Sequence, residues 1–80
     1  MASLWAMRSL SNNFGAAVRQ LREKRGISQE KLAATAGISR TYMSEVERGV
    51  TMVSLLTIAK LAKALDVTMS RLLQHVEADS

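Results

Sequence analysis

The segment from residue 29 to residue 48, QEKLAATAGISRTYMSEVER, constrains the fold more than any other part of the chain. Its apolar residues recur at the three- and four-residue spacing of two short helices. Gly37 stands between them and suits a sharp turn with positive φ, and Ser39 can cap the second helix. Ala33 is small enough to let the two helices cross closely. The segment therefore predicts a helix-turn-helix, and its apolar residues are Leu32, Ala36, Ile38, Met43 and Val46.

Three further helices are expected around this pair. Ser11 or Asn12 can cap a helix that ends at Gly26, a left-handed C-cap. Ser54 can cap a helix after the loop VTMV, and Thr68 can cap a short last helix. Together with the central pair they predict an all-α fold, a compact bundle of five short helices. The expected apolar stripes are Phe14, Val18 and Leu21, then Leu55, Ile58, Leu61, Ala62 and Leu65, and the last helix holds Leu72 and Leu73.

The length of 80 residues allows one small domain. We assign residues 11–76 to a single helix-turn-helix domain and residues 77–80 to a polar tail. Residues 1–10 form an N-terminal extension in which Leu4 and Trp5 either cover part of the core or a partner, or belong to a frayed arm. No apolar run has the length of a signal-peptide core or of a membrane span, so we expect a cytoplasmic protein that uses no membrane.

Composition points to a binding protein and away from an enzyme. The chain has no cysteine, and His75 has no acidic or cysteine partner at ligand spacing, so we expect no metal. No nucleophile has a base beside it, and there is no glycine-rich phosphate loop, so we expect neither catalysis nor a cofactor. The net charge of +4 and the pI of about 10.1 favour a polyanionic partner.

Three segments of the chain resemble those of a known family of regulators, and they are LREKRGISQEKLA, GISRTYMSEVERG and VSLLTIAKLAKALDV. Residues 14–73 resemble the lambda-repressor-like helix-turn-helix domain of the phage-repressor and Xre-like regulators, and most of all the controller proteins of bacterial restriction–modification systems. The resemblance implies a regulator of transcription that binds palindromic operators in double-stranded DNA as a homodimer. It also implies control of its own gene and of the endonuclease gene. A phage-type repressor, or the antitoxin of a toxin–antitoxin pair that mainly binds a partner protein, remains the alternative.

The resemblance assigns the second helix of the motif to the major groove, with its first residues at base edges. The residues expected at the bases are Arg40, Thr41, Tyr42, Ser44 and Glu45. Arginine can donate two hydrogen bonds to guanine, and the threonine methyl can contact that of thymine. Two alternatives are open, since Arg40 can be a solvated residue of a helix start and the Tyr42 ring can pack on a neighbouring helix.

Phosphate contacts are expected from helix N-termini and nearby polar groups. The candidates are Gln29, Ser39, Arg48, Thr51 and Arg22. For Arg22 the resemblance favours a partly buried ion pair with Glu47 that ties the first helix to the third. Related sequences carry a basic residue and an asparagine where this chain has Thr51 and Met52, which predicts a weaker phosphate clamp in this loop.

The resemblance also implies a two-fold dimer, because one recognition helix contacts only a few base pairs. Leu56, Met69 and Leu73 are surplus apolar residues near the C-terminal helices and are expected at the dimer interface. There is no room for a separate ligand-sensing domain, so no small-molecule ligand is expected. The operator sequence, the regulated genes and the sign of regulation do not follow from the sequence.

Overall fold

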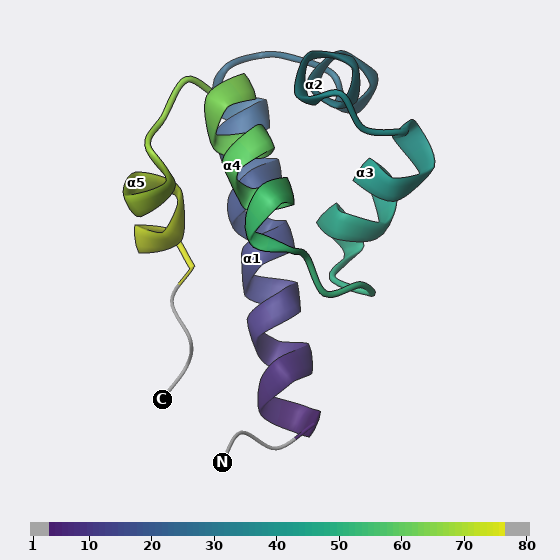
Figure 1. The fold of residues 1–80 in the computed structure, drawn as a ribbon, viewed down its shortest axis with the longest axis vertical. Coiled ribbons are helices and arrows are strands. Elements are labelled where there is room, and N and C mark those ends of the chain that lie inside the picture. Colours follow the sequence, from purple (N-terminus) through teal and green to yellow (C-terminus); the bar gives the residue numbers. More distant parts are fainter. Residues whose placement is uncertain (1–3, 77–80) are drawn as a thin grey trace.

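The computed structural model describes residues 4–76, with side chains in the first helix from residue 9 onward. Within that range the chain forms five helices and no strand (Figure 1), which confirms the predicted all-α class. The helices are α1 (Leu4–Lys24), α2 (Gln29–Ala36), α3 (Arg40–Arg48), α4 (Leu55–Ala64) and α5 (Met69–Gln74). None of these helices is both long and apolar enough to cross a lipid bilayer.

The main contacts between the helices form a closed ring around one core. Helix α1 contacts α3 and α5, α2 contacts α3 and α4, and α4 contacts α5. Figure 1 shows α2 and α3 on the opposite side of α1 and α4 from α5. The helix-turn-helix pair therefore forms one flank of the bundle, and none of the other described helices covers its outer surface.

The core contains the apolar stripes that the sequence predicts, with one exception. Leu55 was expected inside, but its side chain is 74% exposed. An α-helix turns 100° per residue, so Leu55 lies about 90° around α4 from the centre of its buried stripe. Leu61 lies much nearer to that centre. Thr57 is buried instead. The largest fully buried side chains are Val18, Leu32, Met43, Val46, Leu61, Leu65 and Leu72.

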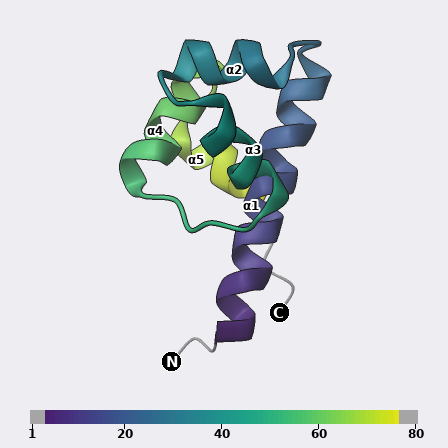
Figure 2. The same ribbon diagram turned by 90° about the vertical axis from the view of Figure 1, so that its right-hand side faces the viewer.

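The predicted start of the first helix was wrong. We expected Ser11 or Asn12 as its N-cap, whereas α1 begins at Leu4 and runs through both residues for 21 residues in all. The segment LWAMRSL consists largely of good helix formers and contains neither glycine nor proline, so nothing stops the helix there. Figure 2 shows the first turns of α1 projecting beyond the other helices. The division of the chain into an extension and a domain stays a prediction.

The turn of the helix-turn-helix forms as its residue types require. Gly37 has φ 74° and ends α2, and its N–H donates to the carbonyl oxygens of Ala33 and Ala34. A left-handed φ of this kind costs glycine little and other residues more. Ser39 follows as the N-cap of α3, and its hydroxyl accepts a hydrogen bond from the N–H of Tyr42. The cap orients the first turn of α3 outward, and this turn carries the candidate site.

Candidate nucleic-acid interface

Five of the residues predicted to contact DNA line one open surface hollow. They come from the first residue of α2 and from the outer face of α3, and they are Gln29, Arg40, Thr41, Ser44 and Arg48. Both arginines are exposed, and the other three side chains offer hydroxyl or amide groups. The hollow therefore combines positive charge with hydrogen-bonding groups, and the opposite face of α3 buries Met43 and Val46 in the core.

Arg40 has a partner that the sequence did not indicate. Its Nη1 lies 3.1 Å from the Oε2 of Glu30 in the first turn of α2. The two side chains are 67% and 73% exposed, so water screens the pair. An exposed ion pair of this kind contributes between nothing and about 1 kcal/mol to stability. The guanidinium of Arg40 can therefore leave Glu30 for a stronger partner at small cost.

The Tyr42 ring packs against a neighbouring helix, which is one of the two roles that the sequence left open for it. Its ring is half-buried against the core, and its hydroxyl shares a hydrogen bond of 3.3 Å with the hydroxyl of Thr57 in α4. Thr57 is held in turn by Ser54, whose hydroxyl donates to the Thr57 oxygen over 3.1 Å. This contact ties the first turn of α3 to the start of α4. Base contact by Tyr42 stays a prediction.

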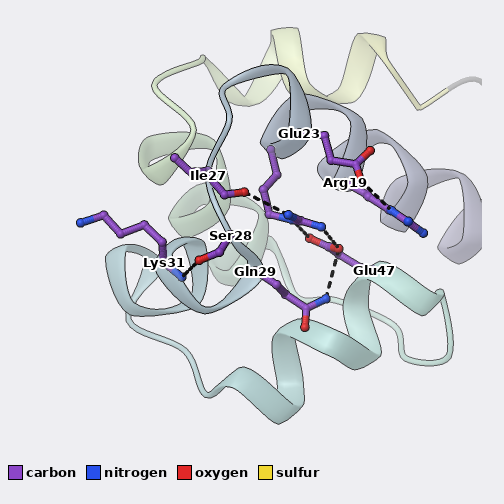
Figure 3. Close-up of polar contacts among 8 residues, drawn as sticks. Arg19, Glu23, Ile27, Ser28, Gln29, Lys31 and Glu47 are labelled. Atoms are coloured by element: carbon purple, nitrogen blue, oxygen red, sulfur yellow. Dashed lines mark hydrogen bonds and ion pairs between the residues drawn. The ribbon is translucent and has the colours of Figure 1, made fainter.

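Arg22 of α1 and Glu47 of α3 are in direct contact. Figure 3 shows the hydrogen bonds that meet at Glu47. The Nε and Nη2 of Arg22 donate to the two carboxylate oxygens of Glu47 over 2.7 and 3.1 Å, and Nη1 donates over 3.0 Å to the carbonyl oxygen of Ile27. The side chains are 13% and 4% exposed. The hydrogen bond to Glu47 raises the pKa of Arg22 above its ordinary value, against the lowering by burial. Three of the five guanidinium N–H groups are thus engaged inside the protein.

Gln29 belongs to both the hollow and this buried pair. Its Nε2 donates to the Oε1 of Glu47 over 3.2 Å, and the side chain also lines the hollow. The sequence indicated Gln29 only as a phosphate contact. Its bond to Glu47 spans eighteen positions in the chain, and no local pattern could have predicted it.

The remaining candidates lie outside the hollow. Glu45 is half-buried on α3, and Ser39 is exposed at its N-cap, where its oxygen is already an acceptor. Thr51 lies in the loop after α3, and its hydroxyl donates to the carbonyl oxygen of Met52 over 3.4 Å. Thr51 lines a different hollow, an apolar one, together with Phe14 and Leu73. The phosphate roles of Ser39, Thr51 and Arg22 stay predictions.

The three residues predicted at a dimer interface are all exposed. Leu56 is 64% exposed on α4, and Met69 and Leu73 are 36% and 42% exposed on α5. Met69 and Ala59 line one hollow, and Leu56 lies one turn before Ala59. Leu73 lines the other, apolar hollow with Thr51 and Phe14. We call Leu56, Met69 and Leu73 together the α4–α5 surface, and its role as an interface stays a prediction.

Comparison with known proteins gives the class of protein. A helix-turn-helix family model matches residues 18–72, and the chain therefore belongs to the helix-turn-helix family of Xre-like regulators. Within that family it is similar to control proteins. It is 51% identical over 61 residues to Control protein C.BamHI of Bacillus amyloliquefaciens, over 75% of each chain. It is 36% identical over 74 residues to Control protein C.MunI of a Mycoplasma species, over 91% of this chain and the whole of that one.

Solved structures give the same result. The restriction–modification controller protein C.AhdI from Aeromonas hydrophila superposes with a TM-score of 0.75 and 47% identity, over 78% of this chain and 94% of that one. The biofilm regulator SinR, solved in complex with DNA, superposes with a TM-score of 0.70 and 34% identity, over 75% of this chain and 97% of its own. The resemblance predicted from the sequence, including the controller subgroup, is confirmed.

Proposed function

We propose that this protein is a sequence-specific DNA-binding regulator of transcription, of the restriction–modification controller type. It binds palindromic operators in double-stranded DNA as a homodimer, in the cytoplasm, and regulates its own gene and a neighbouring endonuclease gene. Similarity to control proteins over three quarters of the chain supports the biological role. The placement of five polar residues at one hollow supports the binding mode.

The single observation that carries the proposal is the division of α3 into two faces. One face is core, and the other presents Arg40, Thr41 and Ser44 to the hollow. In a helix-turn-helix the N-terminal residues of the second helix contact base edges in the major groove. Arg40 and Thr41 begin α3, and Gln29 begins α2 at the same hollow. Gln29 and Arg48 line the same hollow, which supports phosphate contacts by these two side chains.

The first experiment selects binding sites from a random duplex library and titrates the enriched duplex by fluorescence anisotropy at several salt concentrations. We expect a palindrome, bound far more tightly than shuffled DNA. Each phosphate neutralised by a cation should add about 0.9 to the slope of log affinity against log salt. No enrichment, with only weak binding that salt abolishes, would refute operator binding and favour the antitoxin alternative.

Arg40→Ala tests the base contact. We expect it to weaken binding to the enriched duplex by about 1–3 kcal/mol and to relax preference at one base position. Arg19→Ala is the control, since Arg19 is also exposed and also forms an ion pair, with Glu23 one turn away on α1. Both variants remove one charge, so a purely electrostatic effect would weaken them equally. Unchanged relative affinities across single-base variants of the duplex would remove Arg40 from the base contacts.

Leu56→Ser tests the proposed dimer. Because a two-fold interface contains each residue twice, we expect the dimer dissociation constant to rise by at least about tenfold. Leu55→Ser is the control, since Leu55 directly precedes Leu56, is also largely exposed and was not predicted at the interface. Sedimentation velocity at micromolar concentration measures both. A monomeric parent protein, or equal effects of the two variants, would contradict the assignment of the α4–α5 surface.

A further inference from the structure

Glu47 accepts hydrogen bonds from two different elements at once. Its side chain is 4% exposed, and its carboxylate accepts hydrogen bonds from Nε and Nη2 of Arg22 in α1. It also accepts a hydrogen bond from Nε2 of Gln29, which is the first residue of α2. Glu47 itself belongs to α3, so one buried group connects three helices. The connection to Gln29 is the only one of these contacts that leads to the candidate interface.

The chemistry of the carboxylate fixes the orientation of the Gln29 amide. An ionised carboxylate only accepts hydrogen bonds, so it attracts the amide NH₂ group and repels the amide oxygen. Figure 3 shows the amide nitrogen of Gln29 directed at Glu47 and its oxygen directed away. One amide proton is used by Glu47. The second proton and the carbonyl oxygen remain for a ligand at the hollow that Gln29 lines.

We propose that Glu47 is a positioning residue for DNA recognition, which holds the amide of Gln29 in the orientation that contacts DNA. This inference rests on the proposed function and extends it to a residue that touches no DNA itself. A glutamine side chain loses considerable rotamer freedom when it is fixed. A bond made before binding removes much of that cost from the binding step. Arg22 takes part because it holds the carboxylate in place.

A purely structural role makes a different prediction. If Glu47 serves stability alone, its replacement lowers DNA affinity only through unfolding or through a general shift of α3. Such an effect would be independent of the side chain at position 29. A double-mutant cycle separates the two, because a residue that acts through Gln29 has no remaining effect when Gln29 is absent.

The experiment measures affinity for the fluorescein-labelled enriched duplex with the parent, Gln29→Ala, Glu47→Gln and the double variant. It is carried out at a temperature at which circular dichroism shows all four to be folded. We expect Gln29→Ala to weaken binding about tenfold, as for loss of one contact. Glu47→Gln should weaken it several-fold, and the double variant should bind no more weakly than Gln29→Ala. Glu23→Gln controls for the change in net charge, since Glu23 is exposed on α1.

The outcomes separate this inference from the proposed function. If the penalties of Gln29→Ala and Glu47→Gln multiply in the double variant, Glu47 does not act through Gln29 and the inference is overturned. If Gln29→Ala binds as the parent does, the inference is also overturned, while tight binding by the parent still upholds the proposed function. If no duplex is enriched at all, the proposed function fails first.

A measurement on the unmodified protein covers the case in which Glu47→Gln does not fold. Side-chain amide resonances of ¹⁵N-labelled protein report the mobility of each glutamine. We expect the Gln29 amide to be restricted in the free protein and to shift when the duplex is added. Gln20 is the control, because it is exposed on α1. A Gln29 amide as mobile as that of Gln20 would overturn the inference.

Discussion

Replacing Arg22 with methionine is expected to lower the free energy of unfolding by about 3–5 kcal/mol. The substitution leaves Glu47, whose side chain is 4% exposed, without its charged partner. Among the described residues, the amide of Gln29 still donates to its carboxylate. A buried charge without a counter-charge is costly because the protein interior solvates it poorly. For a domain of this size such a loss is a large part of the total stability. Urea unfolding followed by circular dichroism measures it.

Arg19→Met is the matched control for this prediction. Arg19 lies on the same helix and also contacts a glutamate, but the Arg19 and Glu23 side chains are 63% and 56% exposed. We expect its loss to cost less than about 0.5 kcal/mol. Arg22→Met combined with Glu47→Leu should recover most of the stability, because no charge then remains buried. Equal effects of Arg22→Met and Arg19→Met would show that the buried pair is no stronger than a surface pair.

The pH dependence of this stabilisation has a definite sign. The hydrogen bond between Arg22 and Glu47 raises the pKa of Arg22, and the negative charge of the carboxylate raises it further. Burial lowers this pKa by less, so the net shift is upward. A group whose pKa is raised by folding contributes stability that is fully present below its unfolded pKa and is lost as the pH rises through the folded value. For an arginine both values lie far above neutrality. The contribution of Arg22 should therefore be constant across the neutral range.

The sequence predicted the helix-turn-helix well because its signals are local. Gly37, Ser39 and the apolar stripes act within one or two turns of chain, and each has one main structural interpretation. The prediction of where α1 begins was wrong because it also used only a local signal. Ser11 and Asn12 carry capping side chains, but whether they cap depends on the residues before them leaving the helix. The segment LWAMRSL stays helical, so two candidate caps became interior residues.

The sequence proposed the residues of the candidate site, but it did not indicate two of the side-chain bonds that they form. The polar start of a helix whose other face is apolar drew attention to Arg40 and Thr41, and the family resemblance then proposed that they contact bases. The bonds of Arg40 to Glu30 and of Gln29 to Glu47 span ten and eighteen positions. They depend on where α2 and α3 begin relative to each other, which follows from packing of the whole bundle. Base contact by these residues remains to be tested by the variants above.

Gly15 is the residue that the sequence analysis missed. Glycine in the middle of a helix weakens it by about 0.5–1 kcal/mol relative to alanine, which makes such a position unusual. In the structure Gly15 is buried where α1 crosses the end of α3. A methyl group there would lie against the backbone carbonyl oxygens of Val46 and Glu47, only 2.7 Å from the second. Because both are backbone atoms, no side-chain rotation could make room.

Gly15→Ala is therefore expected to lower the free energy of unfolding by about 3 kcal/mol, near the upper end for overpacking. Helix propensity alone would raise it by up to about 1 kcal/mol, so the sign of the change decides between the two effects. Ala16→Gly is the companion variant: Ala16 is the exposed next residue on α1, and there propensity alone should cost about 1 kcal/mol. Urea unfolding of both variants gives the comparison, and a stabilised Gly15→Ala protein would show that α1 and α3 do not cross this closely in solution. The same close crossing predicts that the two losses of stability overlap. In Gly15→Ala the displaced α3 should also move Glu47 away from Arg22. The double variant of Gly15→Ala and Arg22→Met should therefore lose less free energy of unfolding than the sum of the two single losses.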